Sequence, residues 1–394
     1  QANVDKKSFR LIRYQEIPYD QVAQDLGIDR NDPQLVYKLI RSYLDKQSYS
    51  GRYYYQVPTQ LLTTRYLELP VSNKKKAELM IPFQLDDGLP FPSSEAHLVS
   101  QITKEGQSSH AFVSVTKTQE FESYYQDLIN SNVCPAVLSS EPSLLRSFGM
   151  NANIAENYCI LDLGHKYAKA YFFHQKKLVQ NNYNQVAGEL LTSVIAKTYK
   201  ISQLEATIYK HENSFLLVED QFTKVNDDQK EFALLMKNSL SPLVIDLKRW
   251  LIGYNMKTGE SIQHIYLMGG SSNIRNIENF LLENLGINVS RLNVLSSLSL
   301  GKETTLDPKK SSHTLCEIMS TSMSSKELPA NFLFGAYSSE YSDHIPMSSS
   351  AFVATRIYVV SLILLLGLLV ERVILSSRLK DLDKKNITLL KSES

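Results

Sequence analysis

The sequence YCILDLGH at residues 158–165 decides the fold, because an apolar run ends here in a turn that carries charge. A short apolar run bounded by such a turn is typical of a buried strand. Two further strand patterns follow at residues 168–173 and 177–180. We therefore expect this part of the chain to form a meander of strands.

The turn that ends the first of these strands consists of Asp162, Leu163, Gly164 and His165. With glycine at its tip, such a turn lets backbone N–H groups approach a phosphate closely. A carboxylate at the end of a strand, here that of Asp162, would hold Mg²⁺ through water. Aspartate and glycine are also the usual residues of an ordinary hairpin turn, and that alternative stays open here.

A second turn of this kind follows the strand expected over 262–268 and consists of Gly269, Gly270, Ser271 and Ser272. Glycines between a strand and a helix permit positive φ, and a helix N-terminus favours anionic groups. A turn that serves packing alone is the alternative. The chain contains neither GxGxxG nor GxxxxGK[ST], which excludes Rossmann and P-loop nucleotide sites.

Helical patterns lie between the two turns. One begins with Gly188-Glu189, and the next has Ser202 as its N-cap with Glu205 three residues later, which is the pattern of a capping box. A longer helical pattern over 228–254 contains Pro242, so we expect a bend or a split there.

Composition excludes several classes of protein. Hydrophobic residues make up 43% and charged residues 21% of the 394, which excludes a wholly disordered or low-complexity chain. The 42 basic and 41 acidic residues nearly balance, so net charge gives no reason to expect nucleic-acid binding. Cys134, Cys159 and Cys316 lie far apart and form no metal or redox motif, which fits a reducing compartment.

An apolar run, IYVVSLILLLGLLV, occupies residues 357–370. Widened to 352–375, it is long enough for a bilayer core of about 30 Å at about 1.5 Å per residue. We therefore expect one membrane-spanning helix at 352–375, with a buried globular helix as the alternative. Basic residues are more frequent after the run than before it, which would place the tail in the cytoplasm. This rule is weaker beside long domains, so the chemistry of the preceding domain decides the orientation.

The order of these features resembles the second domain of the actin, Hsp70 and sugar-kinase ATPases. In detail the chain resembles PilM and the cytoplasmic part of GspL, actin-like components of the membrane platforms of type IV pili and type II secretion. Short motifs in the first half also resemble those of PilM and GspL. They are Val57-Pro58, Thr64-Arg65, Leu69-Pro70, FQLDDGLPF at 83–91 and Cys134-Pro135. The resemblance covers nearly all of residues 8–340.

This resemblance implies an α/β, actin-like, two-lobed ATPase fold with ribonuclease-H-like halves, similar to PilM and FtsA, followed by one transmembrane helix. The implied division is lobe I at 1–155 with an inserted subdomain at about 74–140, lobe II at 156–340 with a smaller subdomain at about 196–261, a linker at 341–351, a transmembrane helix at 352–375, and the start of a periplasmic helical or coiled-coil segment at 376–394.

The resemblance also implies roles for the two turns, which would face each other across a crevice that holds ATP. Asp162–His165 would be the second phosphate loop, with Mg²⁺ on Asp162. Gly188 and Glu189 would lie beside the ribose and phosphates, Glu205 and Lys210 would face the adenosine, and Gly269–Ser272 would form the adenosine loop.

Two departures argue against an active ATPase. Ala168 stands where the family usually has a small hydroxyl residue, and the family's first phosphate loop would precede Gln1. We therefore expect no catalytic residue and weak or no turnover, with ATP and Mg²⁺ as the cofactors that the fold would bind.

The implied function is that of a membrane-tethered adaptor in a type II secretion or type IV pilus platform. The protein would be a single-pass protein of the bacterial inner membrane with its N-terminal domain in the cytoplasm. Its implied partners are a GspE/PilB-type ATPase, platform proteins of the GspM/PilN/PilO and GspF/PilC types, and a second copy of itself. The alternative is an active, membrane-anchored ATP hydrolase or kinase of the same fold.

Overall fold

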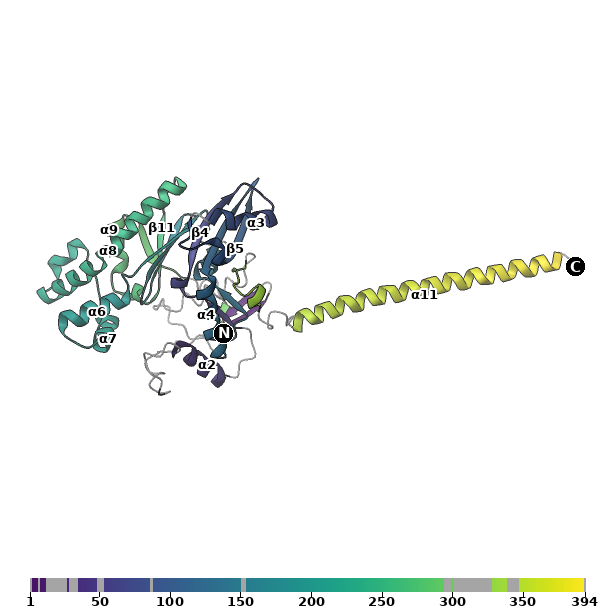
Figure 1. Ribbon diagram of the computed structural model, residues 1–394, viewed down its shortest axis with the longest axis horizontal. Coiled ribbons are helices and arrows are strands. Elements are labelled where there is room, and N and C mark those ends of the chain that lie inside the picture. The colour runs from purple at the N-terminus through teal and green to yellow at the C-terminus, as the bar shows by residue number, and fades with distance from the viewer. Residues whose placement is uncertain are drawn as a thin grey trace. The chain divides into compact units, whose positions relative to one another are not determined.

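The fold is seen in a computed structural model of the chain (Figure 1). The structure describes residues 2–5, 8–11, 27, 35–47, 53–85, 88–149, 154–293, 299–300, 328–338 and 347–392. They fall into two units, Gln1–Phe334 and Gly335–Ser394.

A five-stranded sheet of order β10-β9-β8-β11-β12 organises the second half of the first unit. Its strands are β8 (Tyr158–Leu163), β9 (Ala168–His174), β10 (Lys177–Asn184), β11 (His264–Met268) and β12 (Asn288–Arg291). β8, β9 and β10 are antiparallel neighbours, which confirms the expected meander. β11 runs parallel to both β8 and β12.

Helices cover one face of this sheet, where a core that includes Leu161, Phe172 and Leu267 is buried. They are α6 (Gly188–Tyr199), α7 (Gln203–Asn213), α8 (Asp227–Thr258) and α9 (Ile277–Leu285), with the 3₁₀ turns η4 (Glu219–Lys224) and η5 (Gly270–Asn273). Figure 1 shows α8 and α9 beside β11.

The long helix α8 continues through Pro242 and is not split there. Leu240 and Leu243, on either side of the proline, belong to the same buried core. The free energy gained by tertiary packing therefore exceeds the cost of the backbone hydrogen bond that the proline cannot make.

The opposite face of the sheet packs against α5 (Glu141–Gly149), a helix in which every residue is buried. Leu145 and Phe148 of α5 share a core with Ile160, Tyr171 and Phe173 of β8 and β9. Both faces of the sheet are thus covered, as in α/β folds with helices on two sides.

The first half is built on a three-stranded antiparallel sheet of order β4-β6-β5, against which α3 packs (Figure 1). The elements of this half are β1 (Ala2–Asp5), β2 (Ser8–Leu11), α2 (Leu35–Gln47), β3 (Tyr54–Gln56), η1 (Thr59–Leu61), β4 (Thr63–Leu69), α3 (Lys74–Leu85), η3 (Ser93–Glu95), β5 (Ala96–Glu105), β6 (Ser108–Lys117), α4 (Thr118–Asn130) and β7 (Val137–Ser139). β3 pairs with β7, and β13 (Ser299–Leu300) pairs with β2.

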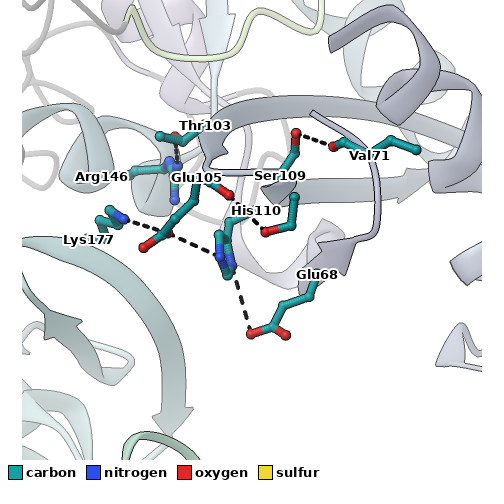
Figure 2. A network of polar contacts seen from close by, with 9 residues as sticks. Glu68, Val71, Thr103, Glu105, Ser109, His110, Arg146 and Lys177 are labelled. Atoms are coloured by element: carbon teal, nitrogen blue, oxygen red, sulfur yellow. Dashed lines mark hydrogen bonds and ion pairs between the residues drawn. The ribbon is translucent and has the colours of Figure 1, made fainter. Parts of the chain in front are cut away.

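A polar network joins this sheet to β10 (Figure 2). The Glu105 carboxylate at the end of β5 accepts a hydrogen bond of 2.8 Å from Lys177 Nζ on β10, and His110 Nε2 lies 3.1 Å from the same oxygen. On α5, Arg146 donates to the Thr103 hydroxyl over 2.6 Å. The carboxylate of Glu105 is half exposed, so its ion pairs contribute little, about 1 kcal/mol or less each.

Residues 328–334 contact the expected lobe I, although the implied division assigns them to lobe II. Phe332 N donates to Leu138 O over 2.8 Å, and Ser139 Oγ donates to Ala330 O over 2.6 Å. The Phe332 ring is fully buried against the rings of His97 and Phe121. The C-terminal part of the first unit therefore anchors on its first half, while the two-lobed division itself stays a prediction.

The second unit contains η7 (Gly335–Tyr337) and α11 (Met347–Ser392). α11 includes all of 352–375, so the expected helix is confirmed, and it takes in part of the expected linker. In the part of the chain that the structure describes, no helix reaches the combination of length and apolar character that crossing a bilayer demands. The membrane-spanning part of the expectation is therefore not confirmed.

Phe332→Ala is expected to lower the free energy of unfolding by about 3–5 kcal/mol, because deleting a buried ring leaves a cavity. Denaturant unfolding of the full chain measures this difference. Leu328→Ala, in the same segment but at a side chain that is 61% exposed, is the control and should change stability by less than about 0.5 kcal/mol. Equal effects of the two substitutions would contradict the anchoring role.

Candidate functional site

Two turns that lie far apart in sequence meet at one edge of the five-stranded sheet. β8 and β11 are parallel neighbours, and their register pairs Asp162 with Met268. Because the carboxyl ends of parallel strands meet at one edge, the turn after Asp162 and the turn after Met268 leave the sheet together. The two turns are thus neighbours at one edge of the sheet, whereas the resemblance implied that they face each other across a crevice.

The turns touch directly and do not face each other across a gap. Ser271 Oγ donates to Gly164 O over 3.1 Å. The N-terminus of α6 joins them, because Gly188 N donates to Gly164 O over 3.1 Å and Glu189 N donates to His165 O over 2.7 Å. The adjacency of β8 and β11 explains this contact, since it leaves the two turns no more than a strand spacing apart.

Two of the glycines are required by this contact. Gly269 has φ +85°, and a Cβ there would meet the Asp162 carboxylate and lie 2.7 Å from Leu163 O. A Cβ on Gly188 would lie 2.7 Å from Ser271 Oγ. Gly270, by contrast, has open space around its Cβ position. The protein's own atoms therefore fill the cradle that these glycines form.

Lys210 of α7 belongs to this cluster, although it is distant in sequence. Its buried ammonium group donates to Gly188 O and to Thr192 Oγ1, each over 2.8 Å. Burial lowers the pKa of Lys210 to about 8. Gly188 and Lys210, which were predicted to line different parts of a nucleotide, are thus in contact.

Glu205 serves its own helix. Its Oε2 accepts from Ser202 N over 2.9 Å and from Ser202 Oγ over 2.7 Å, and Ser202 Oγ accepts from Glu205 N, which confirms the capping box. None of its described hydrogen bonds reaches the two turns. Its predicted contact with adenosine stays a prediction.

The remaining predicted residues divide by exposure. His165 and Glu189 have exposed side chains, with His165 Nε2 4.0 Å from Glu189 Oε1. Leu163 and Ser272 are buried; Leu163 packs in the core, and Ser272 Oγ donates to Gly269 O over 2.7 Å. Of these four residues, His165 and Glu189 present their side chains to solvent.

A buried charge cluster lies behind the first turn. Strand alternation turns Asp162 toward the face that packs on α5, and the β8–β9 register places Lys169 opposite it. Lys169 Nζ lies 3.5 Å from Asp162 Oδ2 and 2.6 Å from Oε2 of Glu141, the first residue of α5. Tyr171 donates its hydroxyl proton to Glu141 Oε1 over 2.7 Å.

The cluster carries two carboxylates and one ammonium group. Burial, and after it the charge of Glu141, raises the pKa of Asp162 to about 7, against the opposing effect of Lys169. Burial alone would lower the pKa of Lys169, but the charges of Glu141 and Asp162 outweigh it and raise that pKa. The carboxyl group of Asp162 is therefore partly protonated and partly ionised near neutral pH.

The sequence reasoning missed Glu141, Lys169 and Tyr171. A usable signal was present in AKAYFF at residues 168–173, where a lysine interrupts an apolar strand directly after the Asp162 turn. A charge on a buried strand needs a buried partner of opposite charge. In a short hairpin, Asp162 was the nearest candidate.

The residues that are present do not fit Mg²⁺ on Asp162. Mg²⁺ requires ionised or neutral oxygen ligands in octahedral geometry, whereas the Asp162 carboxylate already faces the Lys169 ammonium group. Among the described residues, no three histidine, cysteine or acidic side chains gather in a way that could hold a metal ion.

Several backbone N–H groups at the two turns already have acceptors within the protein. Besides the N–H groups of Gly188 and Glu189, that of Gly164 donates to Tyr167 O over 3.1 Å, and that of Ser272 donates to Gly269 O over 3.2 Å. These backbone donors serve the packing of the turns.

Gly269→Ala is expected to lower the free energy of unfolding by about 2–4 kcal/mol, because it adds a Cβ at positive φ and against the Leu163 carbonyl. Gly270→Ala is the matched control on the next residue, and its effect should stay below about 1 kcal/mol. Denaturant unfolding of both variants measures the difference. Equal losses would show that the turns do not pack as described.

The charge cluster predicts a dependence of stability on pH. Between the ordinary aspartate pKa of about 3.9 and the raised pKa of Asp162, about 7, the folded state holds a proton that the unfolded chain has released. This contribution to stability therefore falls as the pH rises from about 4 to 7, by up to about 1.4 kcal/mol per pH unit.

Asp162→Asn should remove this slope. Denaturant midpoints of wild type and variant, measured from pH 4.5 to 7.5, are expected to show a wild-type stability that declines relative to that of the variant. Parallel profiles would mean that Asp162 is ionised throughout.

Comparison with known proteins gives a fold and no sequence family. No family model matches the chain, and no curated protein matches it either. A chain of the solved PilM-PilN type IV pilus biogenesis complex is similar in structure, with 19% identity and a TM-score of 0.58. That similarity covers 75% of this chain and 85% of the other.

Two more distant similarities carry no argument of their own. The cytoplasmic domain of EpsL, an inner-membrane component of the type II secretion system of Vibrio cholerae, has 9% identity and a TM-score of 0.37 over 76% of this chain and 84% of that one. MreB 5 of Spiroplasma citri bound to AMPPNP has 17% identity and a TM-score of 0.37 over 52% and 64%. The predicted resemblance to PilM is confirmed at the level of the fold by the PilM-PilN structure.

Proposed function

We propose that this chain is an actin-like adaptor in the inner-membrane platform of a type IV pilus or type II secretion system. The observation that carries the proposal is the fold similarity to a chain of the PilM-PilN complex, which extends over most of both chains. The likeness covers 75% of this chain and 85% of the other, so it concerns a whole domain and not a single motif.

The proposed partners follow from that comparison and from the sequence resemblance. The similar structure is a complex of PilM with PilN, so a PilN-type or GspM-type platform protein is the first partner. A GspE/PilB-type ATPase on the cytoplasmic side is the second. PilO-type and GspF/PilC-type proteins and a second copy of the chain complete the proposed assembly.

The chemistry of the two turns supports an adaptor over an enzyme. The backbone donors at Gly164 and Gly188 are used within the protein, and Asp162 is paired with Lys169. The side chain of Glu189 is exposed, and its one described ion-pair partner is His165. A phosphoryl-transfer enzyme requires a positioned carboxylate, and the carboxylate of Asp162 is held by Lys169.

Membrane attachment is part of the proposal, with the first unit in the cytoplasm. The apolar run at 357–370 motivates it, because leucines such as Leu364, Leu365 and Leu368 are exposed along α11. Apolar side chains on all sides of a helix need an apolar environment, which a bilayer or a partner helix provides.

Co-flotation of the full chain with vesicles tests tethering and recruitment together. Vesicles of bacterial inner-membrane lipids, the chain and a GspE/PilB-type ATPase from the same organism are mixed and floated through a density gradient. The ATPase should float only when the chain is present. Leu365→Lys should abolish flotation of both, since a lysine in a membrane-spanning helix costs about 3 kcal/mol.

Leu382→Lys is the matched control, because Leu382 is 57% exposed and Leu365 58% exposed on the same helix, and Leu382 lies outside the apolar run. A chain that floats without the ATPase would contradict recruitment, and a chain that stays in the dense fraction would contradict tethering. ATP turnover by the chain alone above about 1 s⁻¹ would favour the enzyme alternative.

A further inference from the structure

The position of Lys169 between two carboxylates is the feature from which this inference starts. Its ammonium nitrogen lies 2.6 Å from Glu141 Oε2 and 3.5 Å from Asp162 Oδ2. The three side chains are buried, with exposures of 15% for Lys169, 9% for Asp162 and 4% for Glu141. At such burial, removal of the ammonium group would leave two carboxylates that need a proton or another cation between them.

Three elements fix the geometry of this cluster. Asp162 and Lys169 are direct partners in the β8–β9 ladder, and Glu141 begins the buried helix α5. Tyr171, two residues beyond Lys169 on the same face of β9, holds the second oxygen of Glu141. Because each partner is set by the backbone of its own element, the ammonium group has little freedom to leave.

We infer that Lys169 is the resident cation of this site, held where a divalent metal ion would otherwise neutralise Asp162 and Glu141. Mg²⁺ and Mn²⁺ need oxygen ligands at about 2.0–2.2 Å and cannot share these oxygens with an ammonium group at hydrogen-bond distance. The first turn therefore works without a divalent cation. This inference rests on the cluster alone and does not depend on the proposed adaptor function.

The inference has a specific consequence for a substitution. Lys169→Met keeps a long unbranched side chain but removes the charge, which leaves the two carboxylates with Tyr171 as their remaining hydrogen-bond partner in the cluster. Two carboxylates that face each other in a buried position attract a divalent cation. The substitution should therefore convert the cluster into a metal site.

Titration of the full chain with Mn²⁺ at pH 8, followed by electron paramagnetic resonance of free Mn²⁺, tests this. Lys169→Met is expected to bind one Mn²⁺ at least tenfold more tightly than wild type, and Mg²⁺ should compete for it. Lys177→Met, which removes the lysine paired with exposed Glu105 (Figure 2), is the matched control and should behave like wild type. The double variant Glu141→Gln/Lys169→Met should return to the wild-type affinity.

Wild-type binding as tight as that of Lys169→Met would overturn the inference, as would a folded Lys169→Met with no gain in affinity. Tight binding that survives in the double variant would place the metal elsewhere and overturn it too. Circular dichroism and thermal melting establish that each variant is folded. If Lys169→Met does not fold, Lys169→Gln, which keeps a polar head without charge, takes its place with the same expected gain.

Discussion

The parallel pairing of β8 with β11 is the constraint on which the rest of the site depends. It brings together two turns separated by more than a hundred residues and gives them one edge of the sheet. The glycines at positions 188 and 269 then let the turns and the start of α6 pack in contact. A shift of β8 by one residue would turn Asp162 to the opposite face of the sheet, away from Lys169 and Glu141. The strand register therefore permits the charge pairing, and the charge pairing in turn favours this register.

A buried charge cluster lies at this edge of the sheet, beside the two turns. Two carboxylates, one ammonium group and a tyrosine hydroxyl satisfy one another behind the first turn, between the sheet and α5. Such a cluster is costly to separate, because each partner would leave an unpaired charge behind. Separating α5 from the sheet would therefore require these charges to be paired elsewhere.

The sequence predicted the order of elements well, because each had a local signal. The apolar run before Asp162, the glycine pair after 268 and the capping box at Ser202 all correspond to elements of the fold. It did not predict the partners of those elements. Glu141 and Lys169 are brought together by packing of α5 on the sheet, and the path of residues 328–334 depends on contacts nearly two hundred residues away. Local patterns carry no information on such pairings.

The attachment of residues 328–334 has a mechanical consequence. A pull on residues 328–334 would be resisted by their contacts with the first half of the unit. The main-chain and side-chain hydrogen bonds of this segment run to β7 at Leu138 and Ser139 and to Gln101 on β5, so a load would be shared among several bonds in parallel. The buried ring of Phe332 adds packing contacts that would also have to break before this segment could move. A load on this segment would thus fall on β5 and β7, the strands to which these bonds run.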